Sequence, residues 1–204
     1  HILIVGHACF PNMGSEAAVT WNWAWHLAES NHVWVIAHGF ARPLVEQYMH
    51  DHPRPNLHFI WVGPLGWWDP WKDPTPTKAR GLRLHYLLWR HAAVAAAQRL
   101  MAMESIDIVH HVSWNSISAP PLLWRTGKPF VWGPIGGGQV LPWRFLTSVG
   151  LAAVLELLRN LRVGIMPWTP SLRRTVARTD LLLAANGESA SVLRRAGAAH
   201  VKLL

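Results

Sequence analysis

The chain has 204 residues, half of them hydrophobic and 15% charged, and its formal net charge is +8. This composition excludes a disordered chain and supports one folded domain, or at most two small ones. The single cysteine, Cys9, excludes an internal disulfide. The excess of Arg favours an anionic ligand, although a coding bias toward Arg, Ala, Gly and Trp would produce the same excess.

Short apolar runs alternate with longer helical patterns along the chain. In chain order, the sequence predicts a strand at 2–5, a helix at 15–30, strands at 33–37 and 57–62, a helix at 78–103, a strand at 106–112, a helix at 116–124, a strand at 129–132, a helix at 141–163, a strand at 181–185, a helix at 188–196 and the start of a strand at 201–204. The sequence does not predict which structure connects the second and third strands.

Most of these strands are almost continuously apolar, which is typical of a parallel sheet that helices cover on both faces. We therefore expect an α/β fold: a three-layer α/β/α sandwich with a mainly parallel sheet of about six or seven strands. No apolar run reaches the length of a membrane span. Residues 63–76 predict a long surface loop. The chain ends while it enters a strand, which suggests that a further domain follows.

The loop after the first strand is a candidate anion site, because ligands of open parallel sheets bind where strands end and helices begin. It closes in Gly14, Ser15 and Glu16, and it has neither a dinucleotide fingerprint nor a P-loop motif. Backbone N–H groups at the positive end of the helix dipole suit a phosphate or a carboxylate. The alternative is that Ser15 only caps the helix.

A pair of histidines lies on the fourth predicted strand. The side chains of His110 and His111 must point to opposite faces of the sheet. One of them is a candidate general base or hydrogen-bond donor, and the alternative is a histidine packed beneath a helix. Trp114 and Asn115 follow at the end of this strand and are candidate contacts for an acceptor.

Three consecutive glycines follow the fifth predicted strand. Gly136, Gly137 and Gly138 are costly to order, because glycine loses more backbone freedom on folding than any other residue. At the carboxyl edge of a sheet, bare backbone lets a substrate come close. These glycines and Gln139 are therefore candidate binding residues.

Other reactive side chains lack the partners that their chemistry needs. His50 and His52 have no third metal ligand at a useful spacing, so we expect no metal site. Cys9 has no clear base beside it, and no serine stands in a G-x-S-x-G elbow. No basic helix carries interleaved aromatic residues, which argues against nucleic acid as a partner.

Two apolar segments offer surfaces for larger partners. Trp67, Trp68 and Asp69 could stack on a sugar and accept its hydroxyls, with a membrane-interface anchor or a lid as alternatives. Residues 141–163 combine apolar side chains with interspersed Arg. They predict an amphipathic surface for an anionic membrane, with a core helix or a contact for a further domain as alternatives.

Three stretches together resemble glycosyltransferase family 4. They read ILIVGHACFPNMGSEAAVTWNWAWHLAESNHVWVIAHG, IDIVHHVSWNSISAPPLLWRTGKPFVWGPIGGGQ and TDLLLAANGESASVLRRAGAAHVKLL. The more specific pieces are G-S-E followed by W-x-W, and G-P-I-G-G-G. The resemblance covers nearly the whole chain and implies the GT-B fold, in which two Rossmann-like domains face each other across a cleft. Residues 1–204 would form the N-terminal, acceptor-side domain, without the C-terminal donor-binding domain.

The implied reaction is that of a retaining, metal-independent bacterial hexosyltransferase of carbohydrate biosynthesis. It needs no cofactor and transfers a sugar from a nucleotide-sugar to a hydroxyl of a sugar or a lipid-linked glycan. Gly14 matches the loop that approaches the donor phosphates, and His110 and His111 match the histidine region of strand four. Many relatives place a histidine directly after strand five, where this chain has Gly133 and Pro134, so Gly136–Gly138 and Gln139 would supply the polar atoms there.

The resemblance also implies a cytoplasmic protein, with peripheral association at the inner face of the cell membrane as an option, and an isolated chain that is inactive. The alternative is a Rossmann-like module that binds an anionic ligand or a membrane without catalysis.

Overall fold

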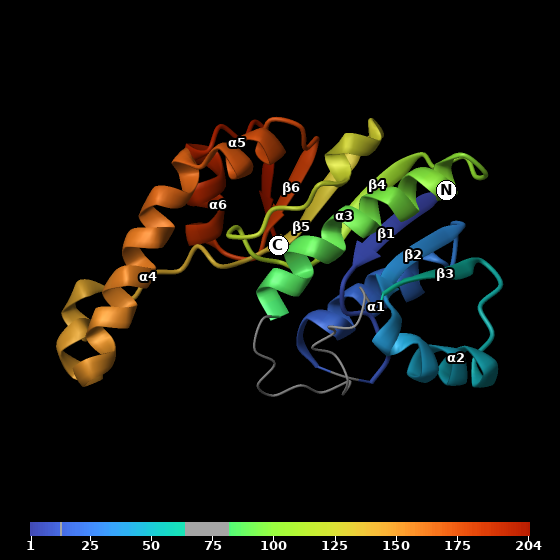
Figure 1. The fold of residues 1–204 in the computed structure, drawn as a ribbon, viewed down its shortest axis with the longest axis horizontal. Coiled ribbons are helices and arrows are strands. Elements are labelled where there is room, and N and C mark those ends of the chain that lie inside the picture. Colours follow the sequence, from blue (N-terminus) through green and yellow to red (C-terminus); the bar gives the residue numbers. More distant parts are fainter. Residues whose placement is uncertain (13, 64–81) are drawn as a thin grey trace. The chain divides into compact units, whose positions relative to one another are not determined.

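The computed structural model describes residues 1–12, 14–63 and 82–204, which form an α/β fold (Figure 1). One seven-stranded sheet has the strand order β3-β2-β1-β4-β5-β6-β7. Its strands are β1 (Ile2–Gly6), β2 (Val33–His38), β3 (Leu57–Val62), β4 (Ile108–Ser113), β5 (Phe130–Ile135), β6 (Leu181–Ala184) and β7 (Val201–Leu203). Helices flank this parallel sheet, so the expected Rossmann-like sandwich is confirmed.

The chain divides into two compact units. One unit comprises His1–Trp114 and Pro121–Val131, and the other comprises Asn115–Pro120 and Trp132–Leu204. The helices of the first unit are α1 (Ser15–Leu27), η1 (Gly39–Ala41), α2 (Arg42–Asp51), α3 (Leu82–Met101) and η2 (Leu123–Thr126). Those of the second are η3 (Trp143–Ala152), α4 (Ala153–Ile165), η4 (Met166–Trp168), α5 (Pro170–Val176) and α6 (Gly187–Arg195).

Strand β1 is the centre of the first unit, since it pairs in parallel with both β2 and β4. Ile4 lies opposite Val35 on one side and His110 on the other. Leu3, Ile4 and Val35 expose no surface. Burial of both faces of β1 explains why its sequence is apolar without alternation.

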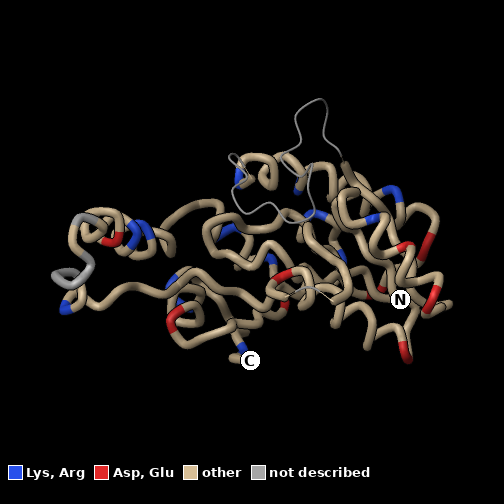
Figure 2. The backbone as a smooth tube through the Cα atoms, turned by 90° about the horizontal axis from the view of Figure 1, so that it is seen from below, with Lys and Arg blue, Asp and Glu red and all other residues tan. Residues whose placement is uncertain are grey.

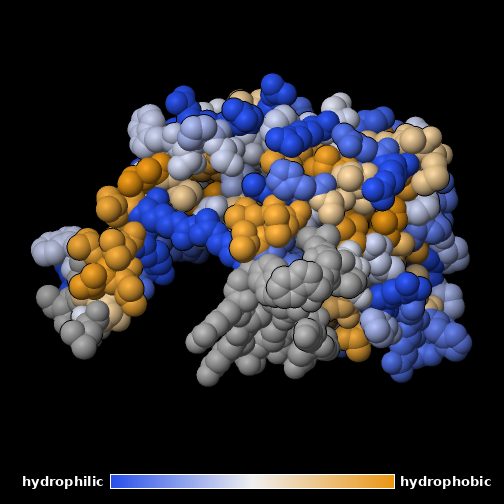
Figure 3. Space-filling view, viewed as in Figure 1, coloured by the Kyte–Doolittle hydropathy of each residue, from blue (hydrophilic) through white to orange (hydrophobic). Residues whose placement is uncertain are grey.

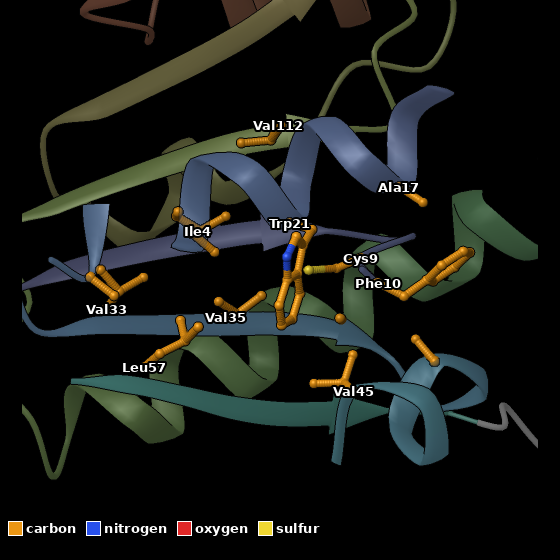
Figure 4. Packing of buried hydrophobic residues seen from close by; sticks show 14 residues of the cluster. Ile4, Cys9, Phe10, Ala17, Trp21, Val33, Val35, Val45, Leu57 and Val112 are labelled. Atoms are coloured by element: carbon orange, nitrogen blue, oxygen red, sulfur yellow. The ribbon is translucent and has the colours of Figure 1, made fainter. Parts of the chain in front are cut away.

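Helices α1 and α3 cover opposite faces of these strands, as Figure 4 shows. Helix α1 turns Ala17, Trp21 and Ala24 toward the sheet, at the spacing of one helical face. Trp21 is 4% exposed and belongs to the same apolar cluster as Cys9 and Val35 (Figure 4). An aromatic side chain of this size buries roughly 150–250 Å², so Trp21 is the main apolar anchor of α1.

The second unit pairs β6 with β7 in parallel and packs α6 against both strands. Asn186 caps α6, because its side chain accepts a hydrogen bond from the N–H of Ser189 at 2.9 Å. Just beyond the helix, Gly197 has a φ of +100°, the left-handed conformation in which helices commonly end.

Two predicted helices differ from the structure. The prediction at 116–124 is wrong: only the short η2 forms there, because Pro120 and Pro121 donate no N–H to a helix. The prediction at 141–163 is wrong in its first half. A 3-10 segment precedes α4, and Gly150 interrupts it with a φ of 55° and a ψ of −133°.

Sequence patterns also missed two helices and placed other boundaries one to several residues away. Helix α2 fills the connection that the sequence left open, and α5 begins with Pro170 at its first turn. The expected strand at 201–204 is confirmed as β7. Most of the predicted loop at 63–76, with Trp67, Trp68 and Asp69, lies outside the described residues. Among the described helices, none is long and apolar enough to cross a membrane.

Candidate functional site

The two histidines of β4 lie on opposite faces of the sheet, as the strand period requires. His110 packs edge-to-face against Trp23 of α1, with ring centroids 4.8 Å apart. His111 faces α3, where its Nε2 lies 3.2 Å from the hydroxyl of Tyr86. Exposed fractions of 5% for His110 and 1% for His111 place both rings beneath helices.

The environment of His111 keeps its ring neutral. Burial lowers the pKa of His111 to about 3, repulsion from His110 adds to this effect, and a backbone hydrogen bond at Trp114 opposes it. Burial likewise raises the pKa of the Tyr86 hydroxyl, and Glu16 acts in the same direction. At neutral pH, His111 and Tyr86 therefore form a neutral hydrogen-bonded pair.

Tyr86 extends this pair toward the end of β4. Its ring stacks on Trp114, with centroids 5.0 Å apart and planes inclined by 27°. The sequence singled out Trp114 and His111 but not Tyr86, because a tyrosine within a helical pattern has no signal beyond its apolar spacing. The structure brings the three side chains together in the first unit.

The amino end of α1 lies directly after the loop that leaves β1. Gly14, not Ser15, is the N-cap residue, so the interpretation of Ser15 as a side-chain cap is wrong. Gly14 has no side chain that could accept from the first turn, and both Gly14 and Ser15 are exposed. Ser15 has a φ of 65°, a left-handed conformation that is uncommon for residues other than glycine. Glu16 is half-buried in the first turn.

A second contact ties α1 to β4 through hydroxyl groups. Thr20 Oγ1 donates to Ser113 Oγ at 3.1 Å, and Ser113 Oγ donates to the carbonyl oxygen of Ala8 at 3.3 Å. A side chain at Gly6 would collide with Thr20. This packing fixes where the loop after β1 begins, and glycine at position 6 is required for it.

The three glycines after β5 have different roles in the second unit. The N–H of Gly136 donates to the carbonyl of Asn115 at 2.6 Å. Gly137 has a φ of +84°, and its N–H donates to the exposed side chain of Gln139 at 3.1 Å. The N–H of Gly138 donates to Ser189 Oγ, also at 3.1 Å.

Close packing explains the third glycine. A Cβ at Gly138 would lie 2.6 Å from the Cα of Ser189, so the backbone of this loop rests directly on the first turn of α6. The expectation that all three N–H groups serve a ligand is weakened, because each already donates within the protein. The Gly137 N–H is the most exchangeable of the three, since its acceptor is a surface side chain.

The chain matches no protein-family model and no curated protein sequence at a significant level. The chemistry of these loops must therefore carry the functional interpretation. Sequence reasoning singled out Gly14, His111 and the glycine loop, but it did not single out Tyr86.

Proposed function

We propose that this chain is the acceptor-side domain of a retaining glycosyltransferase that acts together with a second, donor-binding domain. The observation that carries the proposal is the amino end of α1, which follows the carboxyl end of β1 and has glycine as its cap. This arrangement suits the phosphates of a nucleotide-sugar, because the helix dipole and the first-turn N–H groups favour negative charge.

The proposed chemistry requires positioning more than a protein nucleophile. The first turn of α1 would stabilise the departing nucleoside diphosphate, while its β-phosphate guides the incoming hydroxyl on the same face of the sugar. The neutral pair of His111 and Tyr86 would hold Trp114 against the end of β4. In this role His111 positions the site and does not exchange a proton.

Transfer assays test the proposal. The polypeptide that the gene encodes, including any sequence after Leu204, would be supplied with labelled UDP- and GDP-sugars and a lipid extract. We expect a labelled, anomerically retained product from that polypeptide and none from residues 1–204 alone. Nucleotide binding without transfer would favour the alternative, an anion-binding Rossmann-like module, and neither binding nor transfer would contradict both.

Gly14→Val should abolish this transfer without unfolding the protein. Nothing lies within 4 Å of a Cβ at Gly14, and its φ of −75° is open to any residue. The branched side chain would instead occupy the space in front of the first turn. We expect at least about a hundredfold loss of turnover, as for removal of a transition-state donor. The melting temperature should fall by no more than about 2–4 °C, because valine is a poorer helix cap than glycine. Near-normal turnover would contradict a role for this loop.

A second surface favours association with anionic lipid at the inner face of the cell membrane. Helix α4 buries only Val163. It leaves six apolar side chains more than half exposed: Val154, Leu155, Leu157, Leu158, Leu161 and Ile165. Figure 3 shows this apolar patch in orange at the left of the view. Arg159 and Arg162 belong to the same helix, and Figure 2 shows basic residues in blue along the backbone. Apolar insertion and phosphate attraction would then act together.

Vesicle sedimentation checks this association. Leu158→Ser with Leu161→Ser should weaken binding to phosphatidylglycerol-containing vesicles about tenfold or more, because each exposed leucine would otherwise bury its side chain in lipid. The matched control changes Leu84 and Leu88, which are similarly exposed on α3, and should leave binding unchanged. High salt should release the wild-type protein. Equal loss in both double variants would contradict a specific role for α4.

A further inference from the structure

Three histidines that are distant in the sequence meet in the interior of the first unit. His7 follows β1, His38 ends β2, and His85 lies in the first turn of α3. Their ring centroids are 5.0–5.6 Å apart, and one nitrogen from each ring lies within 4.8 Å of the other two. None is more than 1% exposed.

We propose that His7, His38 and His85 bind a divalent transition-metal ion of the Zn²⁺ type. Neutral imidazole nitrogens are common ligands of such ions, and three histidines with one open position form a known class of zinc site. This proposal does not rest on the proposed glycosyltransferase function. Positions 7, 38 and 85 share no motif spacing, so sequence patterns did not predict this cluster.

The distance between two of the rings supports a shared ion. His7 Nε2 and His85 Nδ1 are 3.4 Å apart, which is long for a hydrogen bond between nitrogens. Two nitrogens bound to one tetrahedral Zn²⁺ at about 2.0–2.1 Å lie about 3.3–3.4 Å apart. The pair therefore already has the separation of two ligands on one ion.

Backbone hydrogen bonds fix the chain around the cluster, and burial keeps the His7 ring neutral. The backbone N–H of His7 donates to the carbonyl of Ser113, and the backbone N–H of His38 donates to the carbonyl of His7, both at 3.1 Å. Trp89 packs edge-to-face on His7 at 4.9 Å. Burial, followed by repulsion from His38, His85 and His111, lowers the pKa of His7 well below its ordinary value. The unprotonated ring is the form that binds metal.

His38 is the weakest of the three ligands. Its Nδ1 accepts a hydrogen bond from the N–H of Phe40 at 3.2 Å. A neutral ring that binds metal through Nε2 carries its proton on Nδ1, so this hydrogen bond must open when the ion enters. The cluster holds no carboxylate, and water or a substrate oxygen would complete a fourfold site.

Refolding with Co²⁺ tests the site, because the buried ion would be acquired during folding. The whole 204-residue chain is unfolded in guanidinium with EDTA, freed of chelator, refolded with excess Co²⁺ and gel-filtered. We expect about one retained ion per chain, with the visible absorption of four-coordinate cobalt, and displacement by Zn²⁺. If the wild-type protein retained no ion, or showed a six-coordinate spectrum, that result would overturn the proposal without any variant.

Substitutions then assign the ligands. His7→Gln and His85→Gln should each lose about nine-tenths of the retained cobalt, whereas His38→Gln should retain more because its coordination opposes an existing hydrogen bond. His26→Gln is the matched control, since His26 is exposed on α1 and lies beside Glu29. Retention by the double variant of His7 and His85 equal to that of the control would overturn the assignment.

Discussion

Replacing Gly138 with Ala should lower the free energy of unfolding by about 2–4 kcal/mol. The added Cβ would lie 2.6 Å from the Cα of Ser189 and 2.7 Å from its N. Both atoms belong to the backbone of α6, so no side-chain rotation relieves the clash. The loop or the helix must shift, and the hydrogen bond between the Gly138 N–H and Ser189 Oγ would be strained as well.

Thermal unfolding followed by far-UV circular dichroism measures this effect. For a chain of this length, we expect the melting temperature of Gly138→Ala to fall by about 10 °C. Gly136→Ala is the matched control from the same glycine run, because its Cβ would meet only the Asn115 carbonyl oxygen at 3.6 Å. That variant should stay within about 0.5 kcal/mol of the wild type. Equal melting temperatures for the two variants would show that α6 does not constrain the loop.

These glycines illustrate what the sequence can and cannot predict. Their number and place after a strand correctly indicated an unusual backbone at the carboxyl edge. The structural need for glycine differs from the prediction. At Gly138 a side chain would collide with the first turn of α6, and Gly137 adopts a positive φ. The neighbour that excludes a side chain at Gly138 lies 51 residues later, so no local pattern could have identified it.

Strands were predicted more accurately than helices for a related reason. The interior strands are buried on both faces, so runs such as Ile2–Gly6 and Val33–His38 stand out from composition alone. Helix α2 was missed because it buries only Val45 and leaves most of its surface polar. The histidine cluster was missed because three separate elements, each ordinary in sequence, bring one side chain to a shared point.

Acid should unfold the protein through its buried histidines. The folded-state pKa of His111, about 3, lies below the ordinary value of 6.5. The unfolded state therefore binds more protons between these values. The contribution of neutral His111 to the free energy of unfolding is fully present above pH 6.5. It is lost as the pH falls toward 3, by roughly 1.4 kcal/mol for each pH unit.

His111→Gln isolates this contribution from the carboxylates that titrate in the same range. Gln keeps a polar group that can face the Tyr86 hydroxyl, but it does not titrate. Guanidinium unfolding in EDTA between pH 7 and 4 should show a pH dependence shallower by about one proton than that of the wild type. His26→Gln, on the surface of α1, should follow the wild-type curve. Parallel curves for His111→Gln and the wild type would mean that the ring takes up its proton without unfolding, and that the packing of Tyr86 and Trp114 against β4 opens to water in the folded protein.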